Sequence, residues 1–97
     1  MIKTWYIYKI TNTINGVSYI GQRKNPTSRY KGSIENDKYF GSGKHLKLSI
    51  KKYGKEFFIK EILISDIRQQ KLADELEKSM IIKYDTYNNG YNLTEGG

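Results

Sequence analysis

Glu77 occupies a position where a carboxylate is costly. It lies in a stretch whose apolar residues recur at helical spacing and define one helix face: Leu72, Ala73, Leu76, Met80, Ile81 and Tyr84. At about 100° per residue, Glu77 lies roughly 60° from the centre of that face, whereas Asp74 and Glu75 point away from it. A carboxylate near a core-facing stripe needs a cation, a hydrogen-bond donor or a metal. Glu77 is therefore either ion-paired with a lysine or a functional ligand.

Two tyrosines, Tyr8 and Tyr19, are predicted to project from one face of a β-hairpin. They belong to Tyr6-Ile7-Tyr8 and Tyr19-Ile20-Gly21, and the turn signal Asn15-Gly16 lies between the two segments. A two-residue turn would set residue i opposite residue 31 minus i, and a longer loop would set it opposite about 27 minus i. Both sums are odd, so Tyr8 and Tyr19 share a face in either register. The pair can be a cross-strand packing contact or part of a reactive site.

Two further polar residues are ambiguous from local sequence. His45, the single histidine, falls at the border between the polar and apolar faces of a predicted helix, where it is either solvated or available for proton transfer or phosphate contact. Asn92 follows the turn signal Asn89-Gly90 and lies between Tyr91 and Leu93, which we expect to cover the core. Its side chain can bond the backbone locally or point into a site.

The elements that must position these residues predict an α+β fold, with a small three-stranded antiparallel sheet flanked by about three helices. Strands are expected at 5–10, 17–21 and 56–64, and the last carries apolar groups on both faces, which favours a central place in the sheet. Helices are expected at 25–31, at 44–53 with Gly54 as the stop, and from a cap at Asp66 to about Tyr84. We expect all 97 residues to form one domain, 1–97.

The charge is strongly positive and uneven. The chain has 17 basic and 10 acidic residues, a net charge of +7, and the segment from Gln22 to Lys60 alone carries +8. Such a field suits a polyanion, most commonly nucleic acid, although lysines also simply solvate exposed faces. The basic residues expected to contact DNA are Arg23, Lys24, Lys44, Lys47 and Lys51.

Several other chemistries lack a motif. There is no cysteine for a disulfide or a thiolate metal site, Gly41-Ser42-Gly43-Lys44 is too short for a phosphate-binding glycine loop, and no serine–histidine–acid triad can be identified. No apolar run reaches the roughly 18 residues of a membrane span. We therefore expect an intracellular, cytoplasmic protein in a reducing compartment that contacts no membrane.

Taken together, these residues resemble the GIY-YIG nuclease family, which cleaves phosphodiester bonds. Tyr6-Ile7-Tyr8 stands where the family has Gly-Ile-Tyr, Tyr19-Ile20-Gly21 matches the second half of its name, and Arg29 falls eight residues after Gly21, where the family's active-site arginine is expected. Glu77 matches the glutamate of the long helix, and Gly90-Tyr91-Asn92 the segment that supplies the family's asparagine. The stretch from Tyr39 to Lys44 also resembles phage-type homing endonucleases, which suits a phage-encoded protein.

The resemblance implies a metal-dependent DNA endonuclease that either nicks DNA or cuts both strands. By analogy, Glu77 holds one Mg²⁺ or Mn²⁺ ion, Arg29 contacts the scissile phosphate, and Tyr8 or Tyr19 takes a proton from the attacking water, with Tyr8 preferred as the base. This role requires a phenol pKa lowered toward neutrality. Asn92 fixes local geometry.

Two positions depart from the family pattern. Ser33 stands where many members have histidine and Gln22 where repair nucleases have lysine, so His45, Arg23 or Lys24 would have to supply the auxiliary group. The alternatives to a nuclease are a non-catalytic nucleic-acid-binding module that retains the fold and a small basic partner-binding domain.

Overall fold

The computed structural model describes residues 3–25, 34 and 37–94 of the 97-residue chain. Strands β1 (Trp5–Asn12) and β2 (Ser18–Lys24) come first, followed by helix α1 (Lys44–Tyr53) and the one-turn 3₁₀ helix η2 (Lys55–Phe57). Strand β3 (Phe58–Ile67) and helix α2 (Gln70–Tyr84) complete the order. The predicted α+β class is confirmed. The described residues contain two α-helices rather than about three, and the helix expected at 25–31 falls almost wholly outside them.

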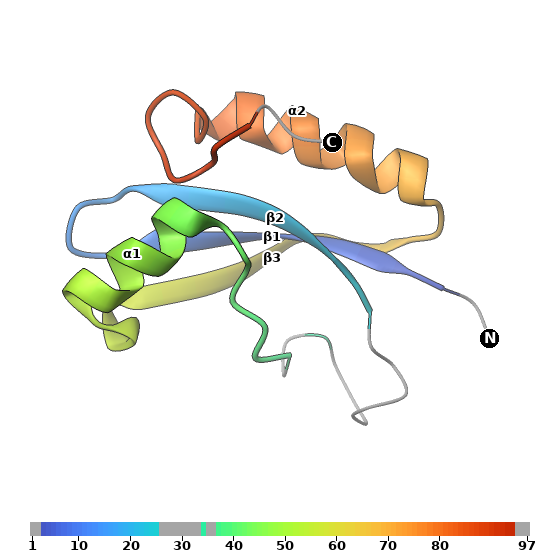
Figure 1. The fold of residues 1–97 in the computed structure, drawn as a ribbon. Coiled ribbons are helices and arrows are strands. Elements are labelled where there is room, and N and C mark those ends of the chain that lie inside the picture. Colours follow the sequence, from blue (N-terminus) through green and yellow to red (C-terminus); the bar gives the residue numbers. More distant parts are fainter. Residues whose placement is uncertain (1–2, 26–33, 35–36, 95–97) are drawn as a thin grey trace.

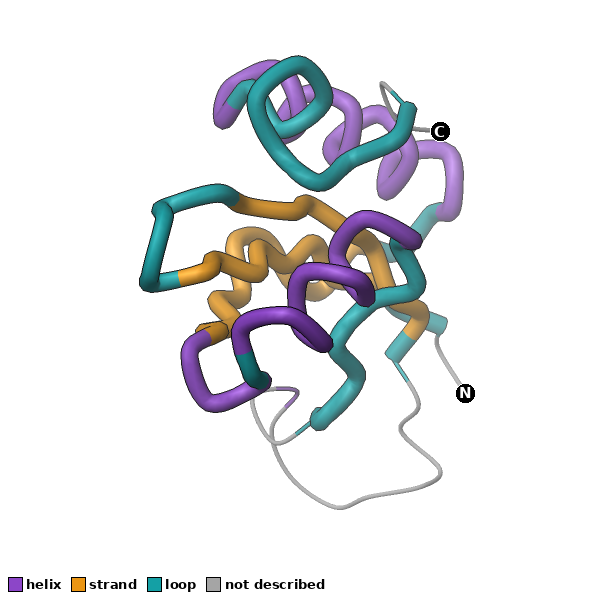
Figure 2. The backbone as a smooth tube through the Cα atoms, turned by 60° about the vertical axis from the view of Figure 1, so that its left-hand side comes forward, coloured by secondary structure: helices purple, strands orange, loops and turns teal. Residues whose placement is uncertain are grey.

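The antiparallel sheet has the order β2-β1-β3, so β1 is the central strand and β3 is an edge strand. The prediction that the third strand is central is therefore wrong. Its apolar groups face both ways because the sheet has helices on both sides: α2 lies along one face and α1 across the other (Figures 1 and 2). An edge strand between two layers needs apolar residues on both faces as much as a central one does.

The hairpin register differs from both predicted values but keeps their parity. Tyr8 lies opposite Gly21 and Ile10 opposite Tyr19, so the paired numbers add to 29. The reason is a four-residue loop, 13–16, closed by the bond from the Asn12 N–H to the Val17 carbonyl (2.9 Å), with Gly16 at φ 75°. Because a shift of two residues leaves every side chain on its face, the predicted shared face of Tyr8 and Tyr19 is confirmed.

Each face of the sheet has its own core. On the α1 face, Tyr6, Tyr8 and Ile10 of the central strand pack with Leu46, Phe58 and Tyr91. On the α2 face, Ile7 and Ile20 pack with Ile67, Ala73 and Ile81. Ile7 and Ile20 are therefore core residues, and the face that carries the tyrosines is as fully covered as theirs.

Helix α1 has the predicted bounds. Gly54 follows it at φ 103° and returns its N–H to the Ile50 carbonyl, a conformation that glycine adopts without steric cost. Leu46 is buried, Ile50 and Tyr53 are half-buried, and Lys44, Lys47, Lys51 and Lys52 are exposed. The amphipathic helix with a basic outer face is confirmed.

Helix α2 begins later than predicted, at Gln70 instead of just after Asp66. Asp66 is not a helix cap: it lies within β3 at φ 60°, next to an irregularity in the β1–β3 register that allows Trp5 to pair with Ile67. The buried stripe of α2 is also rotated from the prediction. Ala73 and Ile81 are its most buried residues, whereas Leu72 and Tyr84 are 42% and 36% exposed. Among the described residues, no helix has the length and apolar character needed to cross a membrane.

Candidate active site

The side chains of Tyr8 and Tyr19 pack together on the α1 face of the hairpin. The ring centroids are 6.2 Å apart and the ring planes are tilted by 42°. Gly21, opposite Tyr8, makes this possible because a Cβ atom there would collide with the Tyr8 hydroxyl. Tyr8 is only 1% exposed, whereas Tyr19 is half-buried, so Tyr19 is the member of the pair that reaches solvent.

The segment before α1 packs directly on the Tyr19 ring. A Cβ atom at Gly41 would come within 3.0 Å of that ring and one at Gly43 within 2.6 Å, so only glycine fits this closely at both positions. The ring of Tyr19 is therefore held between Tyr8 and the start of α1.

Glu77 approaches the sheet at the outer edge of β2. It lies one helical turn from both Ala73 and Ile81, on the stripe of α2 that packs against the sheet, and is half-buried. The amide of Gln22 donates to Glu77 Oε1 at 3.2 Å and to Asp74 Oδ1 at 2.7 Å. A single amide thus joins two carboxylates, and the predicted inward orientation of Glu77 is confirmed. Asp74, expected to point away, is part of the same cluster.

The environment raises the pKa values of both phenols. Burial raises the pKa of Tyr8 most, and the neighbouring tyrosines raise it further. Burial also raises the pKa of Tyr19, and the negative charge of Glu77 adds to this. Without a bound metal ion, neither phenol therefore has the lowered pKa that a tyrosine base needs. For Tyr8, its burial also removes it from any attacking water.

Asn92 stabilises the β2 strand through its backbone. Its side-chain oxygen accepts from the Ile20 N–H and its amide donates to the Ile20 carbonyl, both at 2.8 Å. The neighbouring Tyr91 N–H donates to the Ser18 carbonyl at 2.8 Å, so the C-terminal segment pairs with the free edge of β2 beside Tyr19. Asn92 therefore bonds backbone, but that of a distant strand rather than its own turn as one of the two readings had it. Tyr91 is buried as predicted, but Leu93 is 49% exposed and does not cover the core.

The residues predicted to contact DNA divide into two groups. Four lysines are exposed, one at the end of β2 and three on α1: Lys24, Lys44, Lys47 and Lys51. The Arg23 side chain instead contacts other residues of the protein. Its Nε donates to Asp37 Oδ2 at 2.6 Å, and its guanidinium lies 4.1 Å from the centre of the Tyr39 ring. His45 is exposed on the first turn of α1, two residues after Gly43. Arg29 and Ser33 lie outside the described residues.

Sequence reasoning missed a polar network next to the tyrosines. Tyr6, which replaces the family's first glycine, donates to Asp37 Oδ2 at 2.6 Å. Lys60 donates to the Tyr6 hydroxyl at 2.9 Å and to the carbonyls of Asp37 and Tyr39 at 3.2 and 2.7 Å. Its ammonium group also lies 5.0 Å from the centre of the Tyr8 ring. The sequence feature that could have indicated this network is Lys60, because it places a cation in the middle of an apolar strand.

The donor set near Tyr19 suits one hard divalent cation. Mg²⁺ is usually held by one or two carboxylates and completes its shell with water and phosphate oxygens. Glu77 and Asp74, joined through Gln22, supply such a pair. Within residues 3–25, 34 and 37–94, no group of three or more histidine, cysteine, aspartate or glutamate side chains is arranged to hold a metal, so a fully protein-built cage is absent from this part of the chain.

Comparison with known proteins gives one consistent result. The family model described as "Putative endonuclease segE, GIY-YIG domain" matches residues 2–92. In Enterobacteria phage T4, "Putative endonuclease segD" is 42% identical over 93 residues, covering 91% of this chain and 39% of the relative. "Putative endonuclease segE" of the same phage is 35% identical over 96 residues, covering 95% and 42%. The chain thus spans about two fifths of the length of these relatives.

Two solved structures of the catalytic domain of the homing endonuclease I-TevI share the fold. One superimposes with a TM-score of 0.70 at 30% identity over 93% of this chain and 98% of that one. A mutant of the same domain gives a TM-score of 0.73 at 28% identity, covering 97% of each chain. With the tyrosine pair, the helical glutamate and the family match over residues 2–92, the chain belongs to the GIY-YIG nuclease family.

Proposed function

We propose that this domain is a metal-dependent DNA endonuclease that hydrolyses phosphodiester bonds. The observation that carries the proposal is the position of Tyr19: its ring lies between Tyr8 and the glycines that precede α1, and burial together with the charge of Glu77 raises its pKa. A proton-transfer group held next to a carboxylate that can bind a cation is the minimum apparatus for metal-assisted hydrolysis.

Tyr19 is the proposed proton acceptor. As a phenolate it would take a proton from the attacking water while the water oxygen forms a bond to phosphorus and the bond from phosphorus to the leaving oxygen breaks. Tyr8 is reassigned from base to positioning residue, because it is buried and its ring packs beside the Tyr19 ring. Asn92 positions Tyr19 through the backbone of Ile20.

One Mg²⁺ or Mn²⁺ ion is proposed on Glu77, with Asp74 as a second carboxylate. When bound, it would neutralise developing charge on the phosphate and cancel the negative field that raises the pKa of Tyr19. Gln22 would hold both carboxylates on the same side through its amide. Arg29 would contact the scissile phosphate, a role that rests on the family resemblance alone.

DNA is the proposed substrate because the exposed lysines lie close to this site. Helix α1 presents Lys44, Lys47 and Lys51 to solvent and begins directly after Gly43, which packs on the Tyr19 ring. A strand bound along α1 by its phosphates would therefore pass Tyr19. The T4 relatives support a phage origin, and with it action in the cytoplasm of a host cell.

A supercoiled-plasmid assay tests the proposal. Wild type with Mg²⁺ is expected to give nicked or linear product, and wild type with EDTA none. Glu77→Gln should abolish cleavage while retaining DNA binding, and Glu75→Gln, on the exposed side of the same helix, should cleave like wild type. Cleavage of equal rate by Glu77→Gln would refute the metal role. Salt-sensitive binding by wild type without any cleavage would favour the non-catalytic binding module instead.

A further inference from the structure

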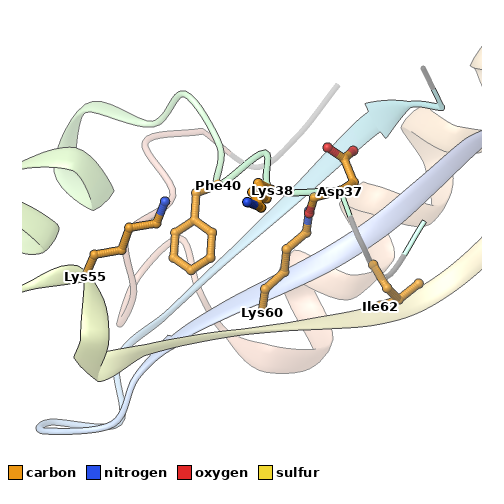
Figure 3. A pocket seen from close by; sticks show the side chains of 6 residues that line it. All are labelled: Asp37, Lys38, Phe40, Lys55, Lys60 and Ile62. Carbon is orange, nitrogen blue, oxygen red and sulfur yellow. The ribbon is translucent and has the colours of Figure 1, made fainter. Parts of the chain in front are cut away.

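A second concave site lies at the other edge of the sheet, along β3. It is a pocket of about 490 Å³ between this strand and the segment that precedes α1, within the size range of small-molecule sites. Figure 3 shows the side chains that line it: Asp37, Lys38, Phe40, Lys55, Lys60 and Ile62. None of these residues belongs to the Tyr19 and Glu77 cluster.

The pocket is electropositive. Of the described residues that line it, three are lysines and one is a carboxylate, Asp37, which is already bonded to Arg23 and Tyr6. Lys60 forms part of the floor. Its ammonium group donates hydrogen bonds to the Tyr6 hydroxyl and to the backbone carbonyls of Asp37 and Tyr39. Lys38 and Lys55 are exposed. The floor thus supplies fixed positive charge, and the rim supplies two ammonium groups that can contact an anion.

The pocket also has an apolar wall. Phe40 and Ile62 are half-buried and line it together, and the Lys55 ammonium lies 4.9 Å from the centre of the Phe40 ring. An aromatic face beside ammonium groups is the combination that binds a nucleotide, because the ring accepts a base by stacking and the cations accept its phosphate. Neither inorganic phosphate nor an apolar ligand alone would use both halves of the pocket.

One segment links this pocket to the candidate active site. Along residues 38–43, Lys38 and Phe40 line the pocket, whereas Gly41 and Gly43 pack on the Tyr19 ring and Tyr39 lies 6.2 Å from Tyr8 between ring centroids. A DNA strand that crosses this segment can therefore contact both edges of the sheet.

We propose that the β3-edge pocket binds one nucleotide of the DNA strand, with its phosphate on Lys38 and Lys55 and its base against Phe40. The proposal rests on DNA being the substrate, as proposed above, but requires neither metal nor cleavage. The pocket would hold the strand at a point separate from the scissile phosphate and contribute affinity through stacking, which α1 lysines cannot provide.

Binding of single strands in EDTA, measured by fluorescence anisotropy across a salt series, tests the pocket. The probes are an eight-residue oligothymidylate, a strand of equal length without bases, and inorganic phosphate as competitor. The variants are Lys38→Ala, Lys55→Ala and Phe40→Leu, which keeps apolar bulk; the matched control is Lys71→Ala, an exposed lysine on α2.

The expected pattern separates charge from stacking. Lys38→Ala and Lys55→Ala should weaken both strands and reduce the slope of log K against log salt by about 0.7 each, whereas Lys71→Ala should not. Phe40→Leu should weaken oligothymidylate binding by about fivefold or more, leave its salt slope unchanged and spare the strand without bases.

Two results would overturn the pocket. One is that Lys38→Ala and Lys55→Ala bind both strands as tightly, and with the same salt slope, as Lys71→Ala. The other is that Phe40→Leu weakens binding of the strands with and without bases equally. The failure of the pocket is distinguishable from failure of the proposed function. If the pattern is seen but the plasmid is not cut, the pocket stands and the nuclease proposal falls; if the plasmid is cut without this pattern, only the pocket falls.

Discussion

The Tyr8 and Tyr19 rings lie 6.2 Å apart between centroids, yet only Tyr19 is open to solvent. The pairing follows from the hairpin register, which puts Tyr8 opposite Gly21 and leaves room for its ring to reach toward Tyr19. Two tyrosines that look equivalent in sequence therefore have different chemistry. One is a buried support, and the other is the group that can meet water and substrate.

Tyr8→Phe should reduce activity moderately because it removes a buried hydroxyl that packs beside Tyr19 and no reacting group. A loss of about tenfold or less in single-turnover cleavage is expected, which corresponds to about 1.4 kcal/mol. The folded state should be retained, as measured by circular dichroism. A loss as large as that of Tyr19→Phe would contradict the assignment of Tyr8 as a positioning residue.

Glu77→Gln should lower the pKa of Tyr19. A nearby negative charge disfavours the phenolate, so removing that charge must shift the titration toward lower pH, although burial still keeps the pKa above its ordinary value. The measurement is an NMR pH titration with ¹³C-labelled tyrosine, in which the Tyr19 signal is assigned by its loss in Tyr19→Phe. Glu75→Gln serves as control, and an identical shift in both variants would show that Glu77 does not act on Tyr19.

Asn92→Ala should destabilise the fold because it leaves both backbone groups of Ile20 without their side-chain partner. Each buried polar group left without a hydrogen bond costs about 1–3 kcal/mol, so a decrease of about 2–6 kcal/mol in the free energy of unfolding is expected from urea denaturation. Asn88→Ala, at an exposed position in the same segment, should change it by less than about 0.5 kcal/mol. An equal decrease in the free energy of unfolding for the two variants would show that Asn92 does not have this structural role.

Asp37→Asn should change how stability depends on acid. Burial raises the Asp37 pKa, but hydrogen bonds from Tyr6 and Arg23 outweigh it and hold that pKa below its usual range. Because the unfolded chain then binds the proton more readily, the stabilisation is present above the unfolded pKa of about 3.9 and is lost as pH falls toward the folded value. Urea denaturation should show Asp37→Asn less stable than wild type at pH 6, with the difference narrowing below about pH 4.

The matched control for this experiment is Glu61→Gln, an exposed carboxylate on β3, which should follow wild type at every pH. A stability difference between Asp37→Asn and wild type that stays constant from pH 6 to pH 3 would mean that the ion pair with Arg23 does not shift the Asp37 titration.

Features set by neighbouring residues were predictable from the sequence. The bounds of α1 follow from its amphipathic pattern and from Gly54, and the shared face of Tyr8 and Tyr19 depends only on the parity of the register. The exact register was not predictable, because the hairpin loop contains four residues whereas Asn15-Gly16 also fits a two-residue turn. Local sequence signals do not fix the length of the loop.

Features that depend on distant partners were not predictable. Asp37, Arg23, Tyr6 and Lys60 come from four separate segments, and nothing in their own sequence neighbourhoods indicates that they meet. The burial of Tyr8 and the exposure of Leu93 depend likewise on how α1 and the C-terminal segment pack. The start of α2 was misplaced because Asp66 has the residue type of a helix cap but lies in β3 at positive φ.

The most direct test is the single-turnover rate of Mg²⁺-dependent cleavage of a DNA duplex by Tyr19→Phe, with Tyr87→Phe as the control at an exposed tyrosine that is 42% accessible. If Tyr19 is the proton-transfer group, Tyr19→Phe should be about 10²- to 10⁴-fold slower than wild type while binding the duplex equally well. Tyr87→Phe should retain the wild-type rate. A Tyr19→Phe rate within about threefold of that control would contradict a cleavage site built around Tyr19 and Glu77.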